Sequence, residues 1–215
     1  MTPLDPDRRL ALSYVPAARR AALDALWRLD AALGAVLAGG KDRMIARIRL
    51  AWWRESLERL DAEPAPAEPV LRSVAEHLLP AISGAELARM ETGWSVLLGD
   101  DPLTGEELDI YAAKRGGSLF GFSARLLGGA SDVEPAGEAW ALADLARRSG
   151  QPDAGSALAA AAARSLPGRW PPPLRPLGML AMLARRDIAR GLDALEPPGS
   201  PARMLLMLRH RLTGF

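Results

Sequence analysis

Residues 104–127 read TGEELDIYAAKRGGSLFGFSARLL, and this stretch decides the fold class. Thr104 followed by Glu107 three residues later is a capping-box signature, which marks the start of a helix. We therefore expect one continuous helix from about residue 105 to residue 127. Aromatic residues make up only 5% of the whole chain, and Ala, Leu and Arg dominate it. This composition favours helices over strands, so the sequence predicts an all-α protein.

Outward from this helix, clusters of Gly and Pro divide the chain into segments of helical length. Residues 16–38 and 41–60 each carry an apolar stripe at helical spacing. Ser83 and Glu86 form a second capping-box signature at the start of residues 83–98. Further helices are expected at 69–79, 136–149, 153–165, 174–192 and 200–212. The sequence predicts a single multi-helix bundle of about eight or nine helices.

The length of 215 residues fits one large domain, and we expect a single domain over residues 1–215. Pro and Gly become more frequent after Gly128, and residues 170–173 (WPPP) form a stiff connector. The part of the chain after residue 150 is therefore expected to be more loosely packed.

Charge and composition exclude several classes of function. There are 27 Lys and Arg against 26 Asp and Glu, a net charge of +1, so no nucleic-acid partner is expected. The absence of Cys excludes thiolate metal sites, iron–sulfur clusters and thiol catalysis. The N-terminal residues lack a secretory pattern, and no apolar run approaches the roughly 18 residues of a membrane span. We expect a cytoplasmic protein that is soluble or at most peripheral to the inner face of a membrane.

Two adjacent tryptophans, Trp52 and Trp53, are the most unusual local feature, with Arg49 and Arg54 on either side. Neighbouring residues on a helix point in different directions, so both faces must be buried or bound there. In one interpretation Trp52 fills the core and Trp53 packs on the next helix. In the other, the tryptophans belong to a surface for lipid or a partner protein.

The helix at 105–127 contains three interior glycines, each of which costs about 0.5–1 kcal/mol relative to Ala. Either close helix packing or a ligand chain lying along the helix would offset this loss, and both interpretations stay open. The candidate groove for a substrate or lipid consists of Trp52, Trp53, Tyr111, Gly116, Gly117, Phe120 and Gly121.

Five strings, taken in order, resemble the squalene/phytoene synthase family over about two thirds of the chain. They are residues 7–12 (DRRLAL), 20–33, 46–55 (ARIRLAWWRE), 111–127 and 137–147 (GEAWALADLAR), with ALWRL at 25–29 in the place of the family's ALYAF. The resemblance implies an all-helical isoprenoid-synthase-like bundle. Enzymes of this family join two isoprenoid diphosphates head to head, and they bind the diphosphates through Mg²⁺ ions held by two aspartate motifs.

Both aspartate motifs are lost in this chain. The three aspartates of the first motif fall on Gly34, Ala35 and Ala38. The second motif, N-x-x-R-D-x-x-x-D, falls on Asp144, Arg147, Arg148 and Pro152, so that only its arginine is kept. We therefore expect no catalytic residue, no metal ligand and no cofactor.

Three functions remain open at this stage. The preferred one is a non-catalytic family member that binds a partner protein or a prenyl-like lipid, resembling the branch of the mitochondrial complex I assembly factor and associating peripherally with a membrane. The alternative is an active prenyltransferase that holds Mg²⁺ in an atypical site made from Asp144, Asp153 and Asp30. The third is a plain helical interaction domain.

Overall fold

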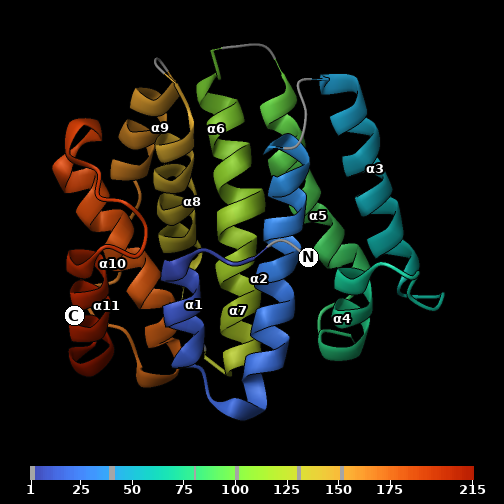
Figure 1. Ribbon diagram of the computed structural model, residues 1–215, viewed down its shortest axis with the longest axis horizontal. Coiled ribbons are helices and arrows are strands. Elements are labelled where there is room, and N and C mark those ends of the chain that lie inside the picture. The colour runs from blue at the N-terminus through green and yellow to red at the C-terminus, as the bar shows by residue number, and fades with distance from the viewer. Residues whose placement is uncertain (1–2, 39–41, 80, 100–101, 130–131, 151–152) are drawn as a thin grey trace.

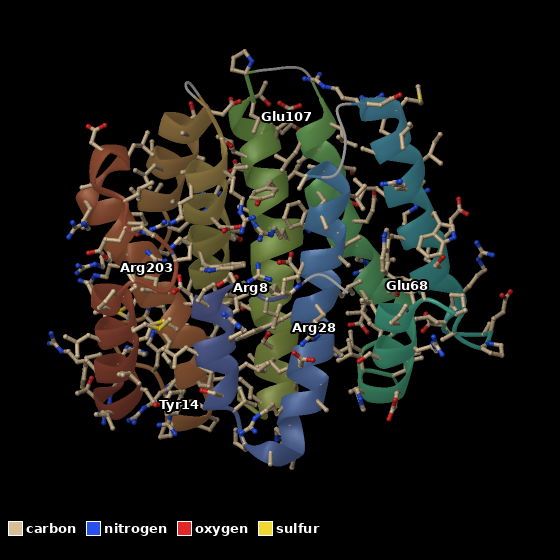
Figure 2. The ribbon with its side chains drawn as sticks, viewed as in Figure 1. Arg8, Tyr14, Arg28, Glu68, Glu107 and Arg203 are labelled. Atoms are coloured by element: carbon tan, nitrogen blue, oxygen red, sulfur yellow. The ribbon has the colours of Figure 1, made fainter. Side chains whose placement is uncertain are left out.

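Both capping boxes that the sequence predicts are formed at the starts of their helices. In the computed structural model, which describes residues 3–38, 42–79, 81–99, 102–129, 132–150 and 153–215, the side chain of Thr104 accepts a hydrogen bond from the amide of Glu107, and the Glu107 carboxylate caps Thr104 in return. Ser83 and Glu86 form the same reciprocal pair. Glu107 lies at the end of the central helix (Figure 2).

The helices are α1 (Pro6–Ser13), α2 (Ala17–Ala38), α3 (Arg43–Arg59), α4 (Pro69–His77), α5 (Gly84–Ser95), α6 (Gly105–Tyr111), the π-helical segment η2 (Ala112–Gly117), α7 (Ser118–Leu127), α8 (Glu134–Arg148), α9 (Asp153–Ala162), α10 (Arg175–Arg190) and α11 (Pro201–Thr213). Three short 3-10 segments join them at Val96–Leu98, Pro172–Leu174 and Leu192–Ala194. With α6, η2 and α7 counted as one continuous helix, the described ranges hold ten helices and no strand, so the predicted all-α class is confirmed.

Every predicted segment contains a helix, and one further helix, α1, was not predicted. Its signals are local, because Asp5 accepts a hydrogen bond from the amide of Arg8 and Pro6 occupies the first turn. The predicted helix start at Lys41 and the motif position at Pro152 lie outside the described residues.

The continuous helix α6–η2–α7 runs through the middle of the bundle (Figure 1). It packs against α8 on one side and against α2 and α5 on the other. Beyond α8 lie α9, α10 and α11, while α3 packs on α5 at the opposite edge. One cluster of buried apolar side chains extends from Leu4 to Met207 and so includes residues of the C-terminal helices. None of the helices in the described ranges is long and apolar enough to cross a membrane.

A close crossing of η2 and α8 explains one of the three helix glycines. A Cβ atom at Gly116 would lie 2.2 Å from the carbonyl oxygen of Gly137, and one at Gly137 would lie 2.2 Å from that of Gly116. The two backbones therefore touch, and neither position has room for a side chain. For Gly116 the structure favours close helix packing.

Candidate functional site

The positions of the first family motif lie on α2, and Gly34 faces the indole ring of Trp94 from α5. A Cβ atom at Gly34 would lie 2.7 Å from the Cη2 atom of Trp94. The indole nitrogen of the same tryptophan donates a hydrogen bond of 3.2 Å to Oδ1 of Asp30, one turn earlier on α2. Trp94 therefore occupies the space into which a side chain at position 34 would point.

We expect Gly34→Asp, which places an aspartate at the first predicted motif position, to lower the free energy of unfolding by about 1–3 kcal/mol, because the buried indole must shift. Ala38→Asp places an aspartate at another predicted position of the same motif, which is exposed, and should change stability by less than about 0.5 kcal/mol. Urea unfolding of both variants measures the difference. Equal stability of the two variants would contradict the contact described for Trp94.

Asp30 is fully buried and is held by two arginines from distant parts of the chain. Arg8 of α1 donates from Nη2 to Oδ2 over 2.7 Å, and Arg115 of η2 donates from Nε to Oδ1 over 3.0 Å. Arg8, on α1, lies near the middle of the bundle in this view (Figure 2). The sequence separations are 22 and 85 residues, so only the fold brings these groups together.

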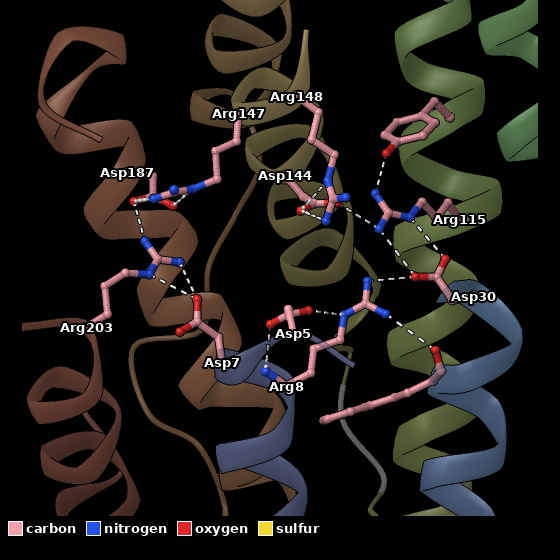
Figure 3. Close-up of polar contacts among 12 residues, drawn as sticks. Asp5, Asp7, Arg8, Asp30, Arg115, Asp144, Arg147, Arg148, Asp187 and Arg203 are labelled. Atoms are coloured by element: carbon pink, nitrogen blue, oxygen red, sulfur yellow. Dashed lines mark hydrogen bonds and ion pairs between the residues drawn. The ribbon is translucent and has the colours of Figure 1, made fainter. Parts of the chain in front are cut away.

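Asp144 of α8 also contacts two arginines, Arg115 and Arg148 (Figure 3). Its Oδ2 lies 2.8 Å from Nη2 of Arg115, and its Oδ1 accepts a hydrogen bond of 2.9 Å from Nη2 of Arg148. Arg115 thus bridges the two carboxylates, Asp30 on α2 and Asp144 on α8.

Aromatic rings enclose the bridging guanidinium of Arg115. Its Cζ atom lies 4.2 Å from the ring centroid of Trp94 and 4.9 Å from that of Trp140, which are cation–π distances. The hydroxyl of Tyr111 accepts a hydrogen bond from Nη1 of the same arginine. We call the following residues the central cluster: Arg8, Asp30, Trp94, Tyr111, Arg115, Trp140, Asp144 and Arg148.

The charges in the central cluster stabilise one another. Burial alone would raise the pKa of Asp30, but the charges of Arg115 and Arg8 outweigh it and hold that pKa below its usual value. Burial opposes ionisation of Asp144 as well, and there Arg115 and Arg148 lower the pKa. Burial would lower the pKa of Arg115, whereas Asp30, Tyr111 and Asp144 raise it well above its ordinary value. All these groups are therefore charged at neutral pH except Tyr111, whose pKa is raised by burial.

These shifts predict a loss of stability in acid. Because both aspartates have lower pKa values in the folded state, their contribution is complete above the unfolded value of about 4. It is lost as the pH falls through the folded values, since protonation then removes the charges that hold the arginines. We expect Asp144→Asn to be less stable at pH 7 and to lose less stability on acidification. Urea unfolding across this pH range measures both slopes, and parallel slopes would contradict the prediction.

The resemblance implies magnesium, so the fit of these carboxylates to that ion can be judged. Magnesium prefers oxygen ligands with excess negative charge, usually carboxylates together with phosphate. In the central cluster, Asp30 and Asp144 each contact two guanidinium groups instead. Asp153, the third acid of the alternative site, accepts a hydrogen bond from the amide of Leu103. Within the described ranges, no group of three His, Asp or Glu side chains is arranged to hold a metal ion. The residues do not fit a magnesium cluster.

Arg147, which the resemblance predicts to be the one residue kept from the second family motif, belongs to a separate ion-pair network. It donates to both oxygens of Asp187 on α10, over 2.8 and 2.6 Å. Arg203 of α11 joins this carboxylate to Asp7 of α1 through hydrogen bonds of 2.7 and 3.0 Å. Four helices are connected in this way (Figure 3), so Arg147 ties the C-terminal helices to the rest of the bundle.

Two of the predicted groove residues line an actual hollow. A pocket of about 480 Å³ lies beside α7 and α8, and its lining includes Gly117, Gly121, Phe122, Glu134 and Glu138. The pocket opens to the surface and does not include the central cluster. Its role as a ligand groove stays a prediction.

The other predicted groove residues lie elsewhere. Tyr111 belongs to the central cluster, and Phe120 is buried with its ring 5.8 Å from that of Trp140. Trp53 is buried on α3, which agrees with its interpretation as a packing residue. The interpretation that Trp52 fills the core is wrong, because this side chain is 42% exposed. It lies edge-on against Trp53, with ring centroids 5.3 Å apart.

Sequence analysis does not identify the partners of the two aspartates. Arg8, Trp94 and Arg115 carry no local signal of burial, because each lies in a polar or ordinary helical stretch. The signal that could have found Trp94 is the glycine at position 34, where a missing side chain makes room for a large one. The arginines that neutralise Asp30 follow only from the three-dimensional arrangement.

Comparison with known proteins gives a match to the model of one family. The model of the squalene/phytoene synthase family matches residues 2–164, a range that includes the whole central cluster and ends before α10. Neither the curated proteins nor the solved structures give a match to the chain. Because the family model covers most of its length, the chain belongs to the squalene/phytoene synthase family.

Proposed function

We propose that this chain is a family member without prenyl-transfer activity, which needs no metal or cofactor. The observation that carries the proposal is that Asp30 and Asp144 are each held by two guanidinium groups. Asp5 pairs with Arg8 as well, so the three arginines of the central cluster are matched by three carboxylates. The arginines are Arg8, Arg115 and Arg148, and the carboxylates are Asp5, Asp30 and Asp144. No negative charge is left over for the divalent ions that would stabilise a departing diphosphate.

We further propose that the chain acts by binding, either to a prenyl-like lipid or to a partner protein, in a helper role similar to that of an assembly factor. The pocket beside α7 and α8 supports this view, because its volume of about 480 Å³ falls in the range of small-molecule sites. Gly117 and Gly121 leave room along one helix face, and Phe122 adds an apolar wall. We place this activity in the cytoplasm, at the inner face of a membrane.

A diphosphate-release assay tests the absence of transfer. The purified chain is incubated with farnesyl and geranylgeranyl diphosphate and Mg²⁺, and released diphosphate is measured. We expect no release above the blank, for the wild type and for Asp144→Asn alike. Magnesium-dependent release that Asp144→Asn abolishes would favour the alternative, an active prenyltransferase with an atypical metal site.

The binding role is tested by extracting the purified chain and identifying lipids by mass spectrometry, alongside a pull-down for partner proteins. Gly117→Leu places a bulky side chain in the pocket and should remove a bound prenyl-like lipid. Gly105→Leu is the matched control, because a Cβ atom at Gly105 would have no neighbour within 4 Å and this residue does not line the pocket. Recovery of neither a lipid nor a protein would contradict the proposed binding role.

A further inference from the structure

The outward face of α3 carries four large apolar side chains that are exposed. Met44, Ile45, Ile48 and Trp52 are exposed by 62, 50, 63 and 42%. Their spacing along the helix places them on one side, opposite the buried residues of the same helix. We call these four residues the α3 ridge. The helix lies at one edge of the bundle (Figure 1). The exposure of the four side chains shows that the ridge faces solvent.

Arginines border the α3 ridge on both sides. Residues 43–54 contain four arginines and no acidic residue, which gives this segment a net charge of +4 against +1 for the whole chain. At 100° per residue, Arg49 falls on one side of the ridge and Arg47 and Arg54 fall on the other. Arg47 donates a hydrogen bond to the carbonyl of Leu98 and is held beside the ridge in this way.

The nearest acidic residues on either side of this segment, Asp42 and Glu55, already have partners. Asp42 caps α3 by accepting hydrogen bonds from the amides of Met44 and Ile45. Glu55 pairs with Arg59 at a distance of 3.5 Å, one turn beyond Trp52. Arg43 donates to the carbonyl of Gly99, and Arg54 also acts on the buried Glu91 of α5, so the cationic border consists of the exposed Arg47, Arg49 and Arg54.

We infer that the α3 ridge docks on the surface of a membrane that contains anionic lipids. An apolar strip bordered by cationic side chains is the pattern of a helix that lies in the plane of a membrane interface. The arginine stems can lie along the apolar strip while their guanidinium groups contact lipid phosphates, and Trp52 suits the level of the headgroups. A partner protein would have to supply an apolar groove with acidic edges on both sides. A lipid surface provides the same chemistry without a matching shape.

This inference does not depend on the proposed loss of catalysis. Binding to vesicles requires neither Mg²⁺ nor diphosphate, and the ridge does not share a residue with the central cluster or the pocket beside α7. The inference rests on the membrane location given under the proposed function and names the surface responsible, so absence of vesicle binding would remove that location and leave the proposed loss of catalysis intact.

The test is flotation of the full chain with vesicles of phosphatidylcholine, with and without phosphatidylglycerol. We expect binding to the anionic vesicles that is at least about tenfold stronger than to the neutral ones and that weakens as salt is added. Ile48→Glu should reduce binding to the anionic vesicles at least about tenfold. Leu205→Glu is the matched control, because Leu205 is 69% exposed on α11 at the other edge of the bundle and the charge change is identical.

Both substituted positions are exposed, so we expect both variants to remain folded. Circular dichroism of each variant checks this. Absence of wild-type binding to anionic vesicles, equal binding to neutral vesicles, or equal loss in the two variants would overturn the inference. A photoreactive residue placed at position 48 in cells provides an independent readout. Crosslinks to lipid would support the inference, whereas crosslinks to one protein and to no lipid would overturn it and identify that protein as the occupant of the ridge.

Discussion

Asp30→Asn should lower the free energy of unfolding by about 3–5 kcal/mol, because it removes one charge from a buried ionic group and leaves its partners behind. The carboxylate of Asp30 is fully buried between Arg8 and Arg115 and also accepts a hydrogen bond from Trp94. The amide of asparagine cannot neutralise either guanidinium. Urea unfolding at neutral pH measures the loss.

Asp24→Asn provides the matched control on the same helix. Asp24 pairs with Arg28 over 2.6 Å at i,i+4, and both side chains are partly exposed. A pair of this kind contributes only about 0.2–1 kcal/mol, so the control should be nearly as stable as the wild type. If both variants lost the same stability, the central cluster would have no special energetic role.

A double-mutant cycle of Asp30→Asn with Arg115→Gln separates the pairwise interaction from the other effects of each change. We expect a coupling energy of about 1–3 kcal/mol, as for residues of one buried network. Additive effects of the two substitutions would show that the two groups do not act together.

Gly116→Ala should lower the free energy of unfolding by about 3 kcal/mol, the upper end of the usual cost of overpacking. The added methyl group would meet the backbone of Gly137 at 2.2 Å, and backbone cannot move aside as the end of a flexible side chain can. The helices η2 and α8 would have to separate, which would also disturb the ion pair between Arg115 and Asp144. Thermal and urea unfolding report the loss of stability.

Gly117→Ala is the control, one residue along the same segment. The nearest atoms to a Cβ at this position lie 3.6 Å away, an ordinary van der Waals distance. Alanine is favoured over glycine inside a helix by about 0.5–1 kcal/mol, so this variant should be as stable as the wild type or slightly more stable. A comparable loss in both variants would mean that helix geometry, and not the crossing, determines the effect.

The helices were predictable because their signals are local. The capping boxes at Ser83 and Thr104 and the apolar stripes depend on residues three or four positions apart, and each gives the helix expected from it. The first helix was missed although it has a cap of its own at Asp5, because eight residues are too few for a clear periodic pattern. The adjacent tryptophans show the limit of such patterns. Their spacing predicts different directions, but only the packing of α3 against its neighbouring helices determines that Trp53 is buried.

The contacts of the central cluster could not be predicted from the sequence. The resemblance to the family predicts that Gly34, Ala35 and Ala38 stand in place of its first three aspartates, and this stays a prediction. The contacts of Asp30 with Arg8 and Arg115 join residues that are far apart in the chain, and no local pattern specifies such pairs. Arg147 illustrates the same point, because its partner Asp187 lies 40 residues away on another helix.

The central claim is that the central cluster does not bind Mg²⁺ together with a diphosphate. Calorimetry with a non-hydrolysable farnesyl diphosphate analogue, in the presence and absence of Mg²⁺, tests this claim most directly. If Asp30 and Asp144 are committed to arginines, titration should give no saturable heat that requires both the ion and the diphosphate. Saturable, magnesium-dependent binding that weakens at least about tenfold in Asp144→Asn would contradict the account, since the aspartate would then be holding metal.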